Sequence, residues 1–427
     1  MMRTTLVLLR LPRMSTRLVN SLPLWGSFAT NGLGMFAAGL MMGAFPWFWF
    51  SGGGSATTAG FIAAAFHGGA ALGLLTGGLL IDRLGPRPVL LSTDLASAVA
   101  FAAACASLIL FEGSVWPTVA FVALGLMLGA PGNVAQDSRV PALARLAGMP
   151  LGRANGLRDL TSQLGQVAGP IAGVLLVEIA GLATVLFLVS AILLLVFMVD
   201  VAVFPAFRKA EADTAQGDIN PMAYIVSNTG LKVIIMLAVL LISALSAINN
   251  LIGPLLAIAH DVGATGLSVF FGVLGAGVLL SILSYSSIGY RYDGRLLLFV
   301  GFSMVAVGLS LISLPMIVGF YAGALVIGFG LGPLWPIVLG AVQRTVPLTL
   351  RAGVIGLLGG AVLIAQPLAS AAVGGVVDAF GPSTTILGFA VVIGCATLIA
   401  SRSQGLFILV DARIQRKTRK ESRGSEV

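Results

Sequence analysis

The chain has 427 residues, of which 58% are hydrophobic and only 9% are charged, and its formal net charge is +8. A soluble domain carries roughly 25% charged residues, so this composition excludes an ordinary soluble protein. The net positive charge is not read as nucleic-acid binding, because the basic residues lie in connections between long apolar runs.

Twelve apolar runs follow one another, each near the roughly 20 residues that a helix needs to cross a bilayer. The first six are predicted at residues 25–50, 57–81, 88–111, 115–136, 160–177 and 182–204. The second six are predicted at 231–255, 265–289, 296–314, 317–341, 352–377 and 382–401. Because only helices satisfy their own backbone groups in hydrocarbon, and the short alternating segments of a β-barrel are missing, the predicted fold is all-α and polytopic.

The longest polar connection divides these runs into two sets of six. The predicted parts are a cytoplasmic N-terminal segment, an N-terminal half, a central connection, a C-terminal half and a basic tail, at 1–22, 23–204, 205–229, 230–402 and 403–427. The two halves share short patterns about 200 residues apart, such as Val140-Pro141 and Val346-Pro347. Repeated halves around a central cavity are a transporter design, so we expect pseudo-symmetric six-helix halves.

All 24 Lys and Arg residues fall on one side of this predicted topology. The only charged residues near the connections on the other side are acidic: Glu112, Glu178, Asp261 and Asp378. Since basic residues gather on the cytoplasmic side, we expect a plasma (inner) membrane protein with both termini in the cytoplasm.

The connection after the second run carries a recognisable pattern at Gly78, Asp82, Arg83, Gly85 and Arg87. It resembles the loop 2–3 signature of the major facilitator superfamily, Gly-x-x-x-Asp-Arg-x-Gly-Arg-Arg, from which only Pro86 departs. The resemblance implies that Asp82 docks against the start of the eleventh span and stabilises the outward-facing state. Asp137, at the end of the fourth run, is expected to join Asp82, Arg83 and Arg87 in a gate cluster. A tight turn with topogenic arginines is the alternative.

The fifth run carries glycines and a proline at Gly156, Gly165, Gly169, Pro170 and Gly173. The spacing is similar to the superfamily's antiporter signature, with Val174 in place of its last glycine, and this favours export. Because the last three glycines recur every four residues, another helix can pack closely on that face. We expect this seam to seal the outer half of the cavity in the inward-facing state, and a single methyl group at Gly169 to be tolerated. A generic small-residue packing face is the alternative.

Shorter patterns, including Leu24-Trp25 and Phe45-Pro46-Trp47, resemble the macrolide-efflux and enterobactin-exporter branch of drug–proton antiporters. The likeness covers about residues 22–402. It implies a secondary active transporter in the lipid bilayer that exchanges its substrate for protons, and it does not fix the substrate. A cavity lined by apolar, aromatic and amide groups suits a small, moderately hydrophobic molecule, so a drug, siderophore or metabolite is expected. We expect a monomer. No cofactor, metal or nucleic-acid partner is expected.

Polar residues inside a membrane are costly and mark candidate cavity positions. These are Asn31, His67, Gln163, Gln166, Asn249, Asn250 and Gln366, for which interhelical hydrogen bonding is the alternative. Trp47, Trp49 and Trp335 are candidate aromatic walls or interface anchors. His67 is the one ionisable side chain deep in a predicted span and suits proton exchange. A lone histidine in a membrane helix is more often a neutral hydrogen-bonding residue, and this interpretation of His67 is preferred; coupling would then lie at Asp94, Asp200 or Glu178.

Other function classes have less support. With two histidines and no phosphate-binding loop, the sequence carries neither a histidine-rich metal site nor an ATP-driven pump, and no enzyme is predicted. An uptake carrier of the same fold is the closer alternative. A channel is more distant.

We predict that reporter fusions at Asp218 and in the tail will give cytoplasmic signals, because every Lys and Arg lies on that side. An external signal at either position would rule out the twelve-helix topology.

Overall fold

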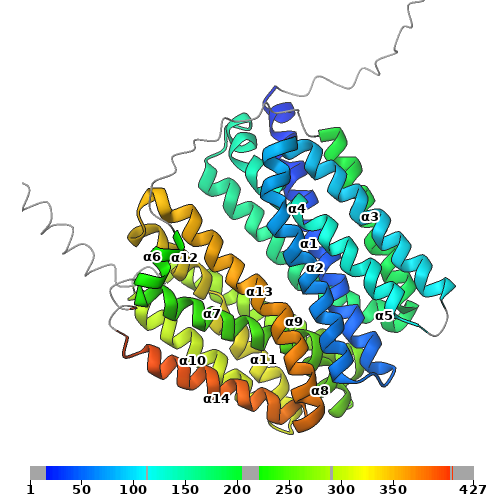
Figure 1. Ribbon diagram of the computed structural model, residues 1–427, viewed down its shortest axis with the longest axis vertical. Coiled ribbons are helices and arrows are strands. Elements are labelled where there is room, and N and C mark those ends of the chain that lie inside the picture. Colours follow the sequence, from blue (N-terminus) through cyan, green and yellow to red (C-terminus); the bar gives the residue numbers. More distant parts are fainter. Residues whose placement is uncertain (1–15, 112–113, 204–220, 289–291, 404–405, 407–427) are drawn as a thin grey trace, which may run out of the picture.

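A computed structural model of the protein describes residues 16–111, 114–203, 221–288, 292–403 and 406. Within these ranges the regular structure is helical throughout (Figure 1). The first group of helices is α1 (Thr16–Ser51), α2 (Ala56–Leu84), α3 (Pro86–Leu110), α4 (Trp116–Leu146) and α5 (Leu151–Val203). The second group is α6 (Pro221–Ser227), α7 (Thr229–Ala247), the π-helix η1 (Ile248–Ile252), α8 (Gly253–Ala259), α9 (Gly263–Ile288), α10 (Gly294–Ile312), α11 (Ile317–Leu331), α12 (Leu334–Thr345), α13 (Leu348–Phe380) and α14 (Pro382–Ala400).

Eleven segments of the described chain are long and apolar enough to cross a membrane, and one of them, α5, has 53 residues. A straight helix of that length would measure about 80 Å, far more than the roughly 30 Å of a hydrocarbon core. The backbone breaks at Gly181, where φ is 78° and ψ is 165°, so α5 contains two spans. Counted in this way the spans number twelve, and the prediction of an all-α polytopic fold is confirmed.

The same backbone turn recurs at Gly85 (φ 84°, ψ 161°) and Gly381 (φ 80°, ψ 162°), where it joins α2 to α3 and α13 to α14. Only glycine reaches positive φ at little steric cost. Gly85 of the loop 2–3 signature is therefore required by the turn itself.

Two predicted boundaries shift on the basic side of the bundle. α4 continues to Leu146, so Arg139 lies inside this helix and is only 3% exposed, although the sequence placed it in a connection. α5 begins at Leu151, nine residues before its predicted start. Residues 16–22 of the predicted N-terminal segment form the start of α1. Most of the two terminal segments and of the central connection lies outside the described residues, and these divisions stay predictions.

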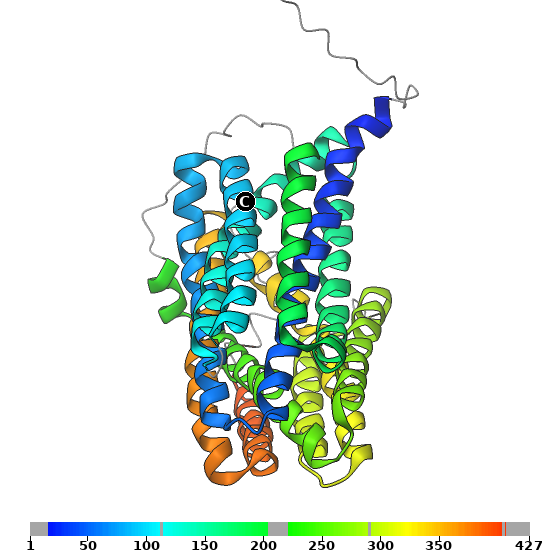
Figure 2. The same cartoon turned by 90° about the vertical axis from the view of Figure 1, so that its right-hand side faces the viewer.

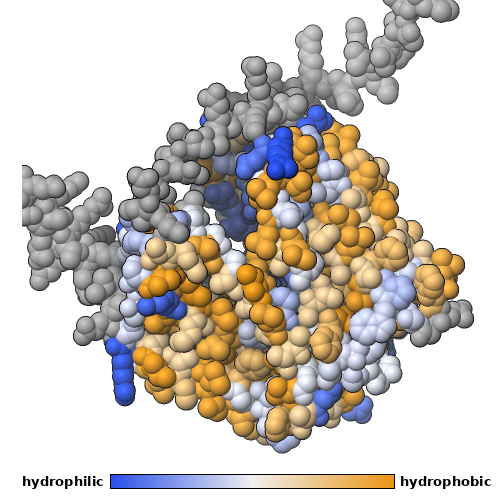
Figure 3. Space-filling view, in the orientation of Figure 1, coloured by the Kyte–Doolittle hydropathy of each residue, from blue (hydrophilic) through white to orange (hydrophobic). Residues whose placement is uncertain are grey.

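The helices form two groups, α1–α5 and α6–α14, that run along the length of the molecule (Figures 1 and 2). Hydrophobic side chains cover much of the outer surface (Figure 3), as lipid contact requires. We call the end with Arg83, Arg145 and Arg344 the basic end. The end with Glu178 and Asp378 is called the opposite end.

Candidate functional site

The two halves meet closely where α2 crosses α13, near the opposite end. A Cβ atom added to Gly60 would lie 2.5 Å from the Ser370 carbonyl oxygen, and one added to Gly374 would lie 2.5 Å from the Ala56 carbonyl oxygen. Contacts this short leave no room for any side chain at either glycine. The backbones of the two halves therefore touch directly along this crossing.

A second contact between the halves joins α5 to α9. The Ser268 hydroxyl donates to the Ile171 carbonyl oxygen at 3.2 Å. Toward the basic end α2 and α13 diverge (Figure 1), and Gly78 of α2 and Gly356 of α13 are exposed, with no atom within 4 Å of an added Cβ atom. A hollow between the halves, with hydrophilic residues inside it, is visible in the space-filling view (Figure 3). The structure is thus closed at the opposite end and open at the basic end.

A cavity of about 690 Å³ lies between the halves. Seven polar side chains line it: His67, Gln163, Gln166, Ser246, Asn249, Asn250 and Gln366. Aromatic rings contribute to its walls, from Phe45, Trp49, Phe66 and Phe271. Among the residues that the structure describes, no Asp, Glu, Lys or Arg lines the cavity. Apolar walls with a few amides suit an uncharged, moderately hydrophobic ligand.

The cavity brings together six of the seven polar residues singled out from the sequence, and it adds Ser246. Of the tryptophans, Trp49 lines the cavity. Trp47 is 5% exposed and its Nε1 donates to Glu178 at 2.8 Å, and Trp335 is exposed. A serine in an apolar run carries little sequence signal, because serine is common in membrane helices as a packing residue.

His67 of α2 faces the C-terminal half across the cavity. Its Nε2 lies 3.3 Å from Asn250 Nδ2 and 3.4 Å from the Ser246 hydroxyl. Since an amide nitrogen can only donate, Nε2 accepts this hydrogen bond and the ring is neutral in this arrangement. The Ser246 hydroxyl also lies 2.8 Å from that of Ser370. A polar cluster at the level of the cavity thus links the two halves.

Asn249 and Asn250 lie in the π-helical turn η1. A π-turn inserts an extra residue into a helix and is frequent at functional sites. Both asparagines line the cavity here, which an uninterrupted α-helix would not favour because consecutive residues point about 100° apart.

Asn31, the seventh predicted cavity residue, does not line the cavity. It is 2% exposed, and its Nδ2 donates to Ser162 Oγ at 2.6 Å and to the Arg158 carbonyl oxygen at 3.2 Å. Asn31 therefore joins α1 to α5 within one half. For Asn31 the alternative prediction, an interhelical hydrogen bond, is the correct one, because its side chain contacts α5 rather than the cavity.

The glycines of the antiporter pattern pack against α1. A Cβ atom on Gly169 would lie 2.6 Å from the Gly39 Cα, and one on Gly165 would lie 2.5 Å from the Gly32 carbonyl oxygen. Gly173 faces Leu40 of the same helix. The expectation that this seam seals the outer half of the cavity is wrong, because its partner helix belongs to the same half. The expectation that a methyl group is tolerated at Gly169 is also wrong, because the atoms it would meet are backbone atoms of α1.

Two further residues of this pattern have separate surroundings. Pro170 lines the cavity beside Gly39, so the bend it allows shapes the cavity wall. Gly156 is exposed, and a Cβ atom there would meet nothing within 4 Å. Gly156 thus lies outside the seam.

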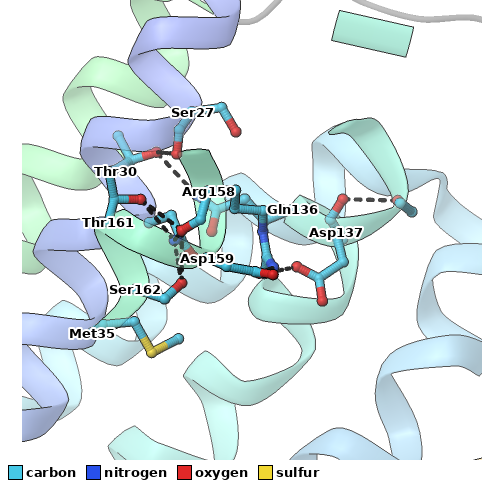
Figure 4. A network of polar contacts seen from close by, with 12 residues as sticks. Ser27, Thr30, Met35, Gln136, Asp137, Arg158, Asp159, Thr161 and Ser162 are labelled. Atoms are coloured by element: carbon cyan, nitrogen blue, oxygen red, sulfur yellow. Dashed lines mark hydrogen bonds and ion pairs between the residues drawn. The ribbon is translucent and has the colours of Figure 1, made fainter. Parts of the chain in front are cut away.

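At the basic end, Asp82 and Arg83 are exposed and Arg87 is half-buried. The ion pair that the structure gives Asp137 is with Arg158 of α5 (Figure 4). This corrects the expected grouping of Asp137 with Arg83 and Arg87: the long α4 places the carboxylate beside the start of α5. The sequence did carry a signal for this pair: Asp137 and Arg158 have opposite charges and lie at the basic ends of consecutive spans.

The acids Asp94 and Asp200 are buried inside the N-terminal half, 8% and 0% exposed, and do not line the cavity. Asp200 interacts with Thr30, Asp94 and Arg139 of the neighbouring helices α1, α3 and α4. The Gln136 amide donates to the Thr30 hydroxyl at 3.0 Å. Charged groups in the membrane part of this half are therefore packed within it, away from the cavity.

Comparisons with known proteins agree with this geometry. The family model described as Major Facilitator Superfamily matches residues 27–244, just over half of the chain. The multidrug efflux pump Tap of Mycolicibacterium fortuitum is 26% identical over 362 residues, covering 82% of this chain and 88% of the relative. A Tap protein of Mycobacterium tuberculosis is 25% identical over 381 residues, covering 86% and 90%.

Solved structures share the fold at low identity. The nucleoside transporter NupG has a TM-score of 0.70 with 14% identity, covering 92% of this chain and 100% of that chain. The D-xylose-proton symporter has a TM-score of 0.70 with 14% identity, covering 90% and 97%.

We predict that Gly169→Ala lowers the stability of the protein by about 1–3 kcal/mol, the usual effect of overpacking. The new methyl group would meet backbone atoms of α1, which cannot move aside as a flexible side chain can. Thermal unfolding in detergent would measure the loss. Gly156→Ala is the matched control, expected to leave the melting temperature unchanged because it meets no neighbour. Equal melting temperatures would contradict a tight α1–α5 seam.

Proposed function

The chain belongs to the Major Facilitator Superfamily, and on this premise we propose that it exports a small, moderately hydrophobic molecule by alternating access, driven by protons. The observation that carries the substrate class is the cavity, with apolar and aromatic walls, amide groups and no charged lining residue. Amides can orient a ligand by hydrogen bonds without requiring it to be an ion.

The direction of transport follows from two further observations. Relatives covering most of the chain are named multidrug efflux pumps. The basic end, which we place in the cytoplasm by the positive-inside rule, is the end at which the halves are separated. A cavity open there accepts substrate from inside the cell, as an exporter requires. The transporter acts in the plasma (inner) membrane, and a monomer suffices because one chain surrounds the whole cavity.

To test export, the chain would be expressed in cells that lack their main efflux pumps, and retention of a panel of neutral lipophilic dyes would be measured. We expect lower retention of at least one dye, reversed by a protonophore. Higher retention would indicate an uptake carrier instead. Counterflow in proteoliposomes would separate a carrier from a channel, since a channel does not exchange labelled for unlabelled substrate.

We further propose that His67 carries the coupling proton. Neutral Nε2 accepts from Asn250 across the two halves, but a protonated ring offers only donors. Protonation would therefore break the hydrogen bond from Asn250 and leave the Ser246 hydroxyl as the acceptor for Nε2, which changes the link between the halves. The groups that contact His67 from α7 and η1 are Ser246 and Asn250, and Gln366 of α13 lines the same cavity; all three are uncharged, so none of them competes with this effect. Proton loss toward the cytoplasm would restore the neutral, substrate-accepting arrangement.

The corresponding prediction is that His67→Gln abolishes proton-driven accumulation in everted vesicles but preserves counterflow. Glutamine supplies an acceptor oxygen for Asn250 and cannot titrate. His260→Gln is the control, since His260 lies outside the cavity beside Phe320, and both activities should persist in it. Survival of driven transport in His67→Gln would move the coupling site to Asp94, Asp200 or Glu178.

A further inference from the structure

Asp378, near the end of α13, caps a helix that belongs to the other half. One carboxylate oxygen accepts the backbone N–H of Ala56 at 3.0 Å, and the other accepts that of Thr57 at 2.7 Å. The Ser55 hydroxyl accepts the next N–H, from Thr58, at 3.3 Å. The first amides of a helix have no partner within the helix. Two of those in α2 are thus satisfied by a side chain from the C-terminal half.

We infer that Asp378 is the latch that keeps the opposite end closed, and that this contact is broken each time that end opens. The inference rests on the proposed alternating-access cycle. A carboxylate at a helix N-terminus is stabilised both by the N–H groups and by the helix dipole. The hydrogen bonds require a donor–acceptor distance of about 3 Å, and the charge–dipole interaction falls off within about one helix turn. The hydrogen bonds are therefore lost, and the dipole interaction is weakened, when α2 and α13 separate.

The surrounding contacts make the latch sensitive to small movements. Gly60 and Gly374 allow backbone contact one to two turns from Asp378, so the cap lies at the end of a rigid crossing rather than on a loop. A tilt of one half relative to the other would lift the carboxylate from both amides together. The latch is therefore made or broken as a unit.

The same two helices carry an acid at the basic end. Because α2 and α13 run in opposite directions across the membrane, Asp82 at the end of α2 lies at the same end of the molecule as the start of α13, and Asp378 at the end of α13 lies at the same end as the start of α2. The family resemblance implies that Asp82 docks at the α13 start in the outward-facing state. In each state the N-terminus of one of the two helices would then be capped by a carboxylate. Forming one of these contacts would offset much of the free energy lost when the other breaks.

The test uses external thiol labelling in cells. Cys105 and Cys395 would be replaced by alanine, and Ala70→Cys would report from the cavity wall. With the latch intact, an impermeant maleimide added outside should label this cysteine slowly. Asp378→Ala should raise the labelling rate roughly fivefold, which corresponds to a shift of about 1 kcal/mol toward the state open outside. Asp378→Asn, which keeps one acceptor oxygen, should have a smaller effect.

Glu178→Gln is the matched control, because Glu178 lies at the same end but binds Trp47 within its own half. Labelling should not change in this variant. If Asp378→Ala lowers the melting temperature and leaves labelling unchanged, Asp378 is only a structural cap and the latch is wrong. Adding Asp82→Asn to Asp378→Ala should bring labelling back toward the original rate, and a further increase would also overturn the inference. Labelling needs no substrate, so it is independent of whether the export assay succeeds.

Discussion

Backbone contact at glycines is the constraint on which the rest of this structure depends. In a bilayer the surrounding lipid is as apolar as the side chains, so helices associate through close packing and hydrogen bonds. Gly39 against Gly169 allows α1 and α5 to touch, and Gly60 against Ser370 does the same for α2 and α13. The first contact lies inside one half and fixes a wall of the cavity. The second lies between the halves, where it can form and separate.

Polar groups distinguish these two kinds of contact. Inside the N-terminal half, Asn31 ties α1 to α5 with several hydrogen bonds, and the ion pair between Asp137 and Arg158 adds a charged tie (Figure 4). Between the halves, His67 and Asp378 make contacts that water or a proton can replace. Strong internal ties and exchangeable links between halves are what a rocking movement of two rigid bodies requires.

The cavity follows from this division. Its uncharged lining is compatible with a hydrophobic ligand because the acids and Arg139 of the N-terminal half are packed elsewhere, and burying an unpaired charge in the cavity wall would be costly. The π-turn at Asn249 and Asn250 adds amides without adding charge. Selectivity of such a cavity depends on shape and on a few hydrogen bonds, which accords with relatives named for efflux of several drugs.

The sequence by itself determined which segments lie in the membrane, the two halves, and most polar side chains of the cavity, because hydropathy and the cost of a buried amide are local properties. It also identified the glycine face of α5, since a four-residue spacing is one face of any helix. Only the tertiary structure decided which helix meets that face. The same limit explains Asn31, Asp137 and Asp378: their partners lie elsewhere in the chain, and the relative register of packed helices, rather than spacing in the sequence, selects the contact.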